Sequence, residues 1–436
     1  MDSRITLQRT GYRVDRVLGP GAVGTSARTV DDVSDQDSTW GRRSRNEPEI
    51  LPVDWDDERR KARLIETRWG RDWRVLGRTR RCLLRVSLAS IPLLVLFGVY
   101  WRVDVAPEQR RLADTRPSID EIYGPRDPAD ATTAVVDLVG LGNLDAAPTA
   151  ATLPALADLG RVWSVRYDNR GLDTRVISDL IDRRATAVGV SNIVLVGHSM
   201  GGVVALEAAQ HLYEDSDKTV GGVVLDCTPV DLHAVREASR DAGEDLLRWI
   251  GWLPGARESR SLRTIVEMAA RQDRFVDTQS SWLPHIEWEE AASAFDEVMR
   301  DKVLNPSAAS NGFIESQFKT IVASGALDNL DALSDEVDGK TAPAIVFLRP
   351  RDGAADTVVD VDYSQRILFE RSGGPDGNLR VVRMPGTGHA NPRQAADMYN
   401  SAITTRVVPM VDASSSRAWK YSAGPDPTER GEVSPR

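Results

Sequence analysis

Residues 192–203 read N-I-V-L-V-G-H-S-M-G-G-V. The first five residues form an apolar run typical of a buried strand, and the next five match G-x-S-x-G with Ser199 at the centre. The segment that follows, G-G-V-V-A-L-E-A-A-Q, favours a helix. A sharp strand-to-helix turn requires small residues such as Gly197 and Gly201, and it would expose the serine at the carboxyl end of a sheet. An idle serine in a glycine turn is the alternative, and the flanking strand and helix argue against it.

The sequence around this stretch alternates between strand-like and helix-like segments. Continuous apolar strands joined by helical crossovers indicate a mainly parallel sheet that is covered on both faces. We therefore predict an α/β domain over residues 131–410. The interval 230–342 is too long for one crossover and contains several tryptophans, so it predicts an inserted helical cap. The expected strands are 133–139, 162–166, 192–196, 222–225, 344–348 and 379–384, and the expected helices are 150–158, 174–187, 201–212 and 392–404.

An apolar run before this domain has the length of a membrane helix. Residues 82–101 carry one charge, Arg85, and about 20 residues cross a ~30 Å hydrocarbon core. We predict a transmembrane helix over residues 82–102, with a buried helix of a soluble protein as the alternative. More arginines precede the run than follow it, which predicts a cytoplasmic N-terminus and an extracytoplasmic domain. The preceding arginines are Arg63, Arg68, Arg71, Arg74, Arg78, Arg80 and Arg81, and the following ones are Arg102, Arg110, Arg111 and Arg116.

The composition limits the remaining possibilities. Residues 1–81 hold 18 Lys and Arg against 14 Asp and Glu, whereas the rest of the chain holds 37 against 51, so the domain is a poor candidate for binding nucleic acid. The two cysteines in the 436-residue chain exclude a disulfide framework and disfavour a cysteine-based metal site. We expect a disordered, basic juxtamembrane segment over 1–81, a polar linker over 103–130 and a disordered tail over 411–436.

A serine nucleophile needs a base, and the base needs an acid to orient it. Of the five histidines, His389 follows the last strand, in M-P-G-T-G-H-A-N-P, at the correct end of a parallel sheet. The acid should follow the preceding strand, in R-P-R-D-G-A-A-D-T-V-V-D. Asp352 and Asp356 both qualify by position.

Residues 132–404 resemble the α/β-hydrolase superfamily. The motifs that carry the resemblance are V-R-Y-D-N-R-G (165–171), G-H-S-M-G-G (197–202) and G-T-G-H-A (386–390), in the family order Ser, Asp, His. The resemblance implies that Ser199 is the nucleophile and His389 the base, and it implies no metal or cofactor. A count from the proline that opens the penultimate strand slightly favours Asp352 as the acid. The sequence after Asp356 resembles the one that follows the family's acid, so both residues stay open.

The resemblance also implies an oxyanion hole built from the backbone N–H groups of Leu141 and Met200. Leu141 lies in D-L-V-G-L-G-N (137–143), where this chain has Val139-Gly140 in place of the family's common His-Gly. The donor is a backbone group, so the missing histidine need not end catalysis. The family's first two strands have little matching material in residues 103–130, which predicts a minimal sheet.

These observations predict a single-pass protein of the cell membrane that carries a serine hydrolase domain. Its partners would be the membrane and a small acyl substrate. The tryptophans of the cap suggest an apolar acyl group and esterase- or lipase-like activity. The alternatives are amidase, peptidase or haloperoxidase-like activity on the same fold, or a non-catalytic binding module at the membrane.

Overall fold

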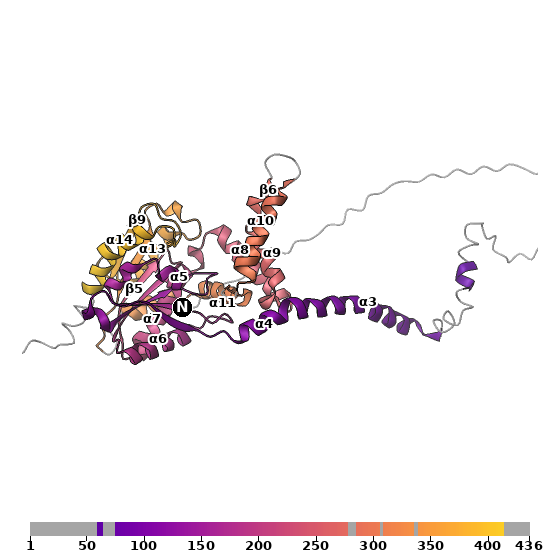
Figure 1. The fold of residues 1–436 in the computed structure, drawn as a ribbon, viewed down its shortest axis with the longest axis horizontal. Helices are drawn as coiled ribbons and strands as arrows, with labels where there is room; N and C mark the ends of the chain where they lie inside the picture. Colours follow the sequence, from indigo (N-terminus) through magenta and orange to yellow (C-terminus); the bar gives the residue numbers. More distant parts are fainter. Residues whose placement is uncertain (1–58, 64–74, 278–284, 306–307, 335–338, 414–436) are drawn as a thin grey trace, which may run out of the picture. The chain divides into compact units, whose positions relative to one another are not determined.

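The central feature of the molecule is a β-sheet (Figure 1). The computed structural model describes residues 59–63, 75–277, 285–305, 308–334 and 339–413, and within them the chain forms a seven-stranded sheet of order β1-β3-β2-β4-β5-β8-β9. All neighbouring strands are parallel except β1 and β3. The mainly parallel α/β sheet predicted from the sequence is confirmed. The strands are β1 (Ser118–Tyr123), β2 (Thr133–Leu138), β3 (Arg161–Arg166), β4 (Asn192–His198), β5 (Thr219–Asp226), β8 (Ala344–Pro350) and β9 (Leu379–Met384).

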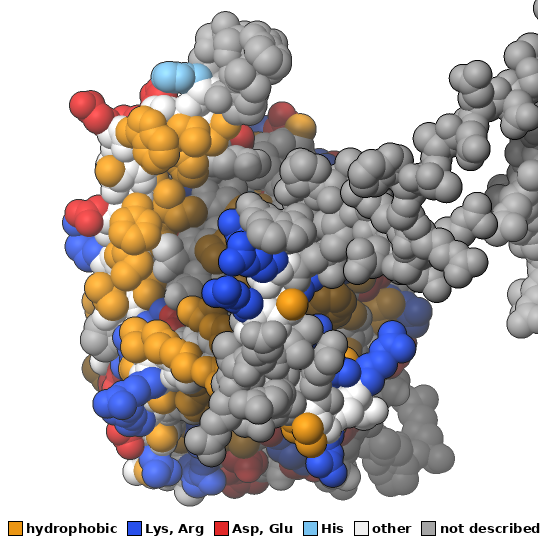
Figure 2. Space-filling model, turned by 90° about the vertical axis from the view of Figure 1, so that its right-hand side faces the viewer, with side chains coloured by type: hydrophobic (Ala, Val, Ile, Leu, Met, Phe, Trp, Pro, Cys, Tyr) orange, Lys and Arg blue, Asp and Glu red, His pale blue; other side chains and the backbone are white. Residues whose placement is uncertain are grey.

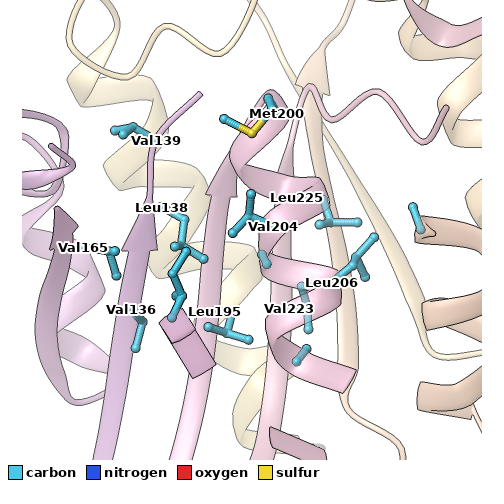
Figure 3. Close-up of a cluster of buried hydrophobic side chains, with 14 of the residues drawn as sticks. Val136, Leu138, Val139, Val165, Leu195, Met200, Val204, Leu206, Val223 and Leu225 are labelled. Carbon is cyan, nitrogen blue, oxygen red and sulfur yellow. The ribbon is translucent and has the colours of Figure 1, made fainter. Parts of the chain in front are cut away.

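The two faces of the sheet are covered by different helices. Along β4, Ile193 and Leu195 belong to one hydrophobic cluster, whereas Val194 and Val196 belong to the other, because successive side chains of a strand point to opposite faces. Figure 3 shows the first cluster, in which Leu195 lies among side chains of β2, β5 and the helix after β4. That face packs against α6 (Thr174–Val188), α7 (Met200–Asp215) and α13 (Val361–Arg371), and the other face against α5 (Ala147–Ala150), the 3-10 turn Pro154–Asp158 and α14 (Ala396–Ala402).

A helical insertion separates β5 from β8, as the sequence predicts. Its helices are α8 (Glu237–Trp252), α9 (Arg260–Ala269), α10 (Trp288–Val298), α11 (Asn311–Val322) and α12 (Ala326–Ser334), with a short hairpin of β6 (Val276–Asp277) and β7 (His285–Ile286). The last two helices belong to the main core, because Phe313 and Leu330 are buried in the cluster that contains Leu195. The cap proper is therefore α8 to α10, which lie away from the sheet in Figure 1.

The segment expected to be a polar linker, 103–130, is folded instead. It contains α4 (Ala106–Ala113) and the edge strand β1, which pairs antiparallel with β3. The prediction of a linker was wrong because β1, S-I-D-E-I-Y, is short and carries charges, as edge strands often do. This edge of the sheet therefore has one antiparallel strand, in the segment where the sequence offered few residues to form the family's first two strands.

A continuous helix precedes the folded domain. α3 spans Arg78–Tyr100 and passes through a π-turn, Trp101–Val105, into α4. Among the described residues, the stretch Arg78–Ala113 is long and apolar enough, by length and composition, to cross a membrane. α3 contains no buried residue, and its large apolar side chains are exposed. The disorder expected over 1–81 and 411–436 falls mostly on residues outside the described ranges; within those ranges, residues 59–63, 78–81 and 411–413 are helical, against that expectation.

Candidate active site

Ser199 occupies the sharp turn between β4 and α7. Its backbone has φ 54° and ψ −124°, a conformation that non-glycine residues rarely adopt. Residues in such strained conformations cluster at functional sites. The turn depends on two glycines: a Cβ at Gly197 would lie 2.3 Å from the carbonyl oxygen of Gly201, and one at Gly201 would lie 2.3 Å from that of Leu138. The Ser199 N–H donates a 2.7 Å hydrogen bond to the carbonyl of Asp226. This strained turn presents the serine at the carboxyl end of the sheet.

The loop after β9 brings His389 to the serine. His389 Nε2 lies 2.9 Å from Ser199 Oγ, and its Nδ1 lies 2.9 Å from Asp356 Oδ2. With Nδ1 protonated toward the carboxylate, Nε2 can accept the serine proton. His389 lies 190 positions after Ser199 and 33 positions after Asp356 in the sequence. The fold therefore brings three distant residues into one series of hydrogen bonds from carboxylate to hydroxyl.

The structure corrects the preference for Asp352 as the partner of His389. Asp352 is exposed and caps the short 3-10 turn Gly353–Ala355, where it accepts a 3.0 Å hydrogen bond from the N–H of Ala354. Asp356, the alternative, is fully buried. The carboxylate beside His389 is therefore the one that the sequence after Asp356 suggested, and the count from the proline that opens the penultimate strand pointed to the wrong residue.

The environment of Asp356 keeps its carboxylate charged. Burial alone would raise the pKa of Asp356, but the hydrogen bond and charge of His389 and the N–H groups of Val359 and Val358 outweigh it and lower the pKa below its ordinary value. These N–H groups lie 2.8 and 2.9 Å from Oδ1. Arg236 holds the same loop by donating to the carbonyl of Asp356 at 2.7 Å. The buried acid is thus a fixed, ionised partner for His389.

The loop after β2 lies on the other side of the serine. A Cβ at Gly140 would lie 3.1 Å from Ser199 Cβ, so the loop backbone passes directly beside the serine. Leu141 follows Gly140 and lines the cavity at Ser199. Met200 begins α7, where the first N–H groups have no partner inside the helix. The two backbone groups expected to form an oxyanion hole therefore belong to segments that meet at Ser199.

Gln317 supports this loop and was not found from the sequence. Its side chain is fully buried on α11, its Oε1 accepts a 2.9 Å hydrogen bond from the N–H of Gly142, and its Nε2 donates to the carbonyl of Asn143 at 3.1 Å. A glutamine 175 residues away from its partner carries no local signal in the sequence. The Gln317 amide, which belongs to the helical insertion, thus holds the loop after β2 in place.

A buried charged network lies beneath the serine. His198 Nδ1 lies 2.8 Å from Asp226 Oδ2, and its Nε2 lies 3.0 Å from Asp137 Oδ1. Burial alone would lower the pKa of His198, but the two carboxylates outweigh it and raise the pKa to about 10. Asp226 also accepts a 3.0 Å hydrogen bond from Tyr399, whose hydroxyl accepts one from the N–H of Asn391 near His389. The network joins the ends of β2, β4 and β5 to the histidine loop.

A cavity of about 440 Å³ opens at the serine. None of the tryptophans with described side chains is among its lining residues, so the expected contact of the cap's tryptophans with substrate does not appear in this part of the chain. Its walls combine apolar side chains with Ser199, His389 and further polar residues, among them Asn143, Asp145, Thr149, Ser239, Arg393 and Gln394. The apolar lining residues include Val139, Leu141, Val235, Phe318, Ile321, Val358 and Val359.

A metal ion does not fit this arrangement well. Ligand atoms of Cys227, Asp356 and His389 lie within 4.8 Å of one another. Both ring nitrogens of His389 already face other groups, and a metal would take Asp356 from the histidine. Burial raises the pKa of the Cys227 thiol well above its ordinary value and disfavours the thiolate that metals bind. The donor set instead suits proton transfer.

Several solved structures are similar in fold. An esterase from Exiguobacterium antarcticum is 16% identical, with a TM-score of 0.42, and the match covers 68% of this chain and 96% of that chain. A monoacylglycerol lipase from Paleococcus ferrophilus is 15% identical, with a TM-score of 0.42, and covers 68% and 99%. A proline iminopeptidase from Mycobacterium smegmatis is 13% identical, with a TM-score of 0.38, and covers 69% and 97%. No curated protein matches the sequence.

The family assignment comes from the sequence itself. A model described as the alpha/beta hydrolase family matches residues 124–402, well over half of the chain. The match begins directly after β1 and ends with α14, so it includes the Ser199 turn, the insertion and the His389 loop. The chain belongs to the α/β-hydrolase family.

Proposed function

We propose that this protein is a serine hydrolase that cleaves esters of apolar acyl groups through an acyl-enzyme. The observation that carries the proposal is the chain of contacts from Asp356 through His389 to Ser199, with both distances at 2.9 Å. A serine hydroxyl is a weak nucleophile until a base within hydrogen-bonding distance can take its proton. The apolar side chains among the cavity's lining residues, such as Leu141 and Phe318, support an apolar acyl group.

The proposed reaction uses these contacts in order. Ser199 Oγ attacks the ester carbonyl carbon while His389 Nε2 takes its proton, and the N–H groups of Leu141 and Met200 stabilise the oxyanion. The intermediate collapses, the alcohol leaves with the proton from His389, and the acyl group stays on Ser199. Water then attacks the acyl-enzyme with His389 as base, which releases the carboxylic acid and restores the serine. Asp356 holds the imidazole and stabilises its charged form.

Labelling with a fluorophosphonate tests this role of the serine. The probe reacts covalently with an activated serine, so the wild-type chain should be labelled and Ser199→Ala should not. Ser239 also lines the cavity and makes Ser239→Ala a matched control, which should keep the label. Equal labelling of wild type and Ser199→Ala would overturn the proposal. A panel of acyl esters and matched amides then tests the substrate class, and faster cleavage of the amides would refute the ester assignment.

We further propose that α3 anchors the enzyme in the cell membrane, with the N-terminus in the cytoplasm and the hydrolase domain outside. Support comes from its 23 helical residues, which at about 1.5 Å each match a ~30 Å hydrocarbon core, and from its large apolar side chains, none of which is buried. The excess of arginines before the helix supports the orientation. Reporter fusions after Arg81 and at the C-terminus test it: the two reporters should report opposite sides, and the same side for both would exclude a single span.

A further inference from the structure

The segment that follows α3 is fastened to the cap by a buried carboxylate. Asp104, in the π-turn after α3, is 8% exposed. Its Oδ2 accepts a 2.6 Å hydrogen bond from Ser259 Oγ, and its Oδ1 accepts bonds from the N–H and the hydroxyl of Ser261, both at 2.8 Å. These serines begin α9, where the helix dipole favours a negative charge. The first turn of α9 is therefore tied to the residues that directly follow α3.

A second set of contacts joins the turn between α8 and α9 to the end of α3. Gly255 has φ +77°, and a Cβ there would lie 2.8 Å from Val105 and 3.2 Å from the ring of Trp101. The hydroxyl of Tyr100 donates to the carbonyl of Pro254 at 3.2 Å. Only a glycine allows the chain to approach Trp101 this closely in a left-handed conformation. The α8–α9 turn thus lies directly against the last residues of the apolar helix.

The cap carries large apolar side chains that its own core does not use. The core consists of Ile250, Ala256 and Leu262 with partly buried neighbours. Outside it lie the residues that we call the apolar cap face, with exposed fractions of 83% for Trp252, 44% for Leu253, 75% for Trp288 and 47% for Phe295. Trp288 and Phe295 are seven positions apart on α10, so they share one side of that helix. Figure 2 shows hydrophobic side chains gathered on the side of the molecule where α9 and α10 lie.

We propose that the apolar cap face rests on the lipid surface beside the point where α3 leaves the bilayer. Trp252 and Leu253 immediately precede Pro254, which contacts Tyr100, so they lie within a few residues of the expected membrane boundary. Tryptophan is enriched at this boundary because its ring is apolar and its N–H is polar. A lipid surface is favoured over a second copy of the chain because the face continues from the proposed membrane helix. The proposal rests on the membrane anchor proposed above.

Docking of the cap would also position the active site relative to the lipid. α8 begins near the cavity, where Ser239 lines the wall, and ends at Trp252. The 13 residue steps from Ser239 to Trp252 span about 20 Å at ~1.5 Å per residue. A cap that rests on lipid would therefore hold the cavity at a fixed height above the bilayer.

Fluorescence quenching in vesicles tests the proposal on the full-length chain. Cys82→Ser removes the exposed thiol, and Cys227 is buried. An environment-sensitive fluorophore would then be attached to single cysteines in Trp252→Cys, Trp288→Cys, Leu94→Cys in α3 and Val176→Cys in α6. Leu94 and Val176 are exposed apolar positions, at 66% and 42%, and serve as the lipid and water references. The vesicles would contain phosphatidylcholine and phosphatidylglycerol, with nitroxide-bearing lipid or aqueous iodide as quencher.

We expect the labels at positions 252 and 288 to be quenched by nitroxide lipid and protected from iodide, as the label at position 94 is. The label at position 176 should be quenched by iodide and not by nitroxide lipid. If the labels at positions 252 and 288 are quenched only by iodide, like the label at position 176, while the label at position 94 is quenched by lipid, the docking proposal is overturned and the anchor stands. If 94 is also quenched only by iodide, the anchor fails and the docking proposal fails with it.

Discussion

Asp356 Oδ2 lies 2.9 Å from His389 Nδ1, whereas Asp352 is exposed and hydrogen-bonded only within its own turn among the contacts of the described residues. Two aspartates four positions apart thus have different surroundings. The buried one faces the histidine and the other caps a 3-10 turn.

We predict that Asp356→Asn lowers kcat by roughly 10⁴-fold, because an amide facing Nδ1 holds the wrong imidazole tautomer. Asp352→Asn is the matched control and should keep kcat within about twofold, since a polar side chain can still cap the turn. Steady-state ester hydrolysis measures both. A large loss in Asp352→Asn with an active Asp356→Asn would reverse the assignment of the acid.

We predict that Gln317→Met lowers kcat more than it changes KM. The methionine has a similar shape but cannot hold Gly142 and Asn143, so the N–H of Leu141 would lose its position. Loss of one oxyanion donor costs roughly 10²–10³ in kcat, and a displaced donor should cost about tenfold or more. Gln210→Met, at a partly exposed glutamine on α7, controls for the loss of an amide. An unchanged kcat in Gln317→Met would show that the loop holds its shape without the amide.

We predict that His198 stabilises the fold in a pH-dependent way. Its pKa is raised to about 10 in the folded chain, against roughly 6.5 unfolded. The stabilisation is therefore fully present below about pH 6.5 and is lost as the pH rises toward 10.

Two measurements check this prediction. The ring nitrogens of His198 should show the chemical shifts of an imidazolium at pH 8 in a histidine-labelled sample. The thermal midpoint should fall between pH 7 and pH 9.5 more steeply in wild type than in Asp137→Asn, which removes one of the two carboxylates. Neutral-imidazole shifts at pH 8 would contradict the raised pKa.

We predict that Gly197→Ala destabilises the fold by about 3 kcal/mol or more, because the new methyl group would meet the backbone of α7 at 2.3 Å and no rotamer can relieve it. Gly124→Ala is the matched control, since a Cβ there would meet nothing within 4 Å. Thermal unfolding compares the two. Equal midpoints would show that the turn can open without penalty.

The sequence predicted the parts of the fold that leave a local pattern. The strands 133–139 and 192–196 were found because buried parallel strands are continuous apolar runs, and Ser199 and His389 because each follows such a run. β1 was missed because a short, charged edge strand has no such pattern. The choice between Asp352 and Asp356 depends on which side of the loop carries extra residues, and counting along the chain cannot decide that.

Contacts between distant segments were also beyond the sequence. Gln317 meets Gly142 only because α11 packs against the sheet. The Asp137–His198–Asp226 network left a weaker trace, since these residues are charged or polar positions in otherwise apolar strands. Their closeness follows from the strand order β2-β4-β5, which the sequence alone does not specify.

Trapping the acyl-enzyme tests most directly whether Ser199 is the nucleophile. The wild-type chain would be mixed with p-nitrophenyl butyrate, quenched in acid within the first turnover, digested and analysed by mass spectrometry. We expect a butyryl group on the peptide that contains Ser199, and none on that peptide in Ser199→Ala. Ester hydrolysis that persists in Ser199→Ala, or a butyryl group that forms only on another residue, would contradict it.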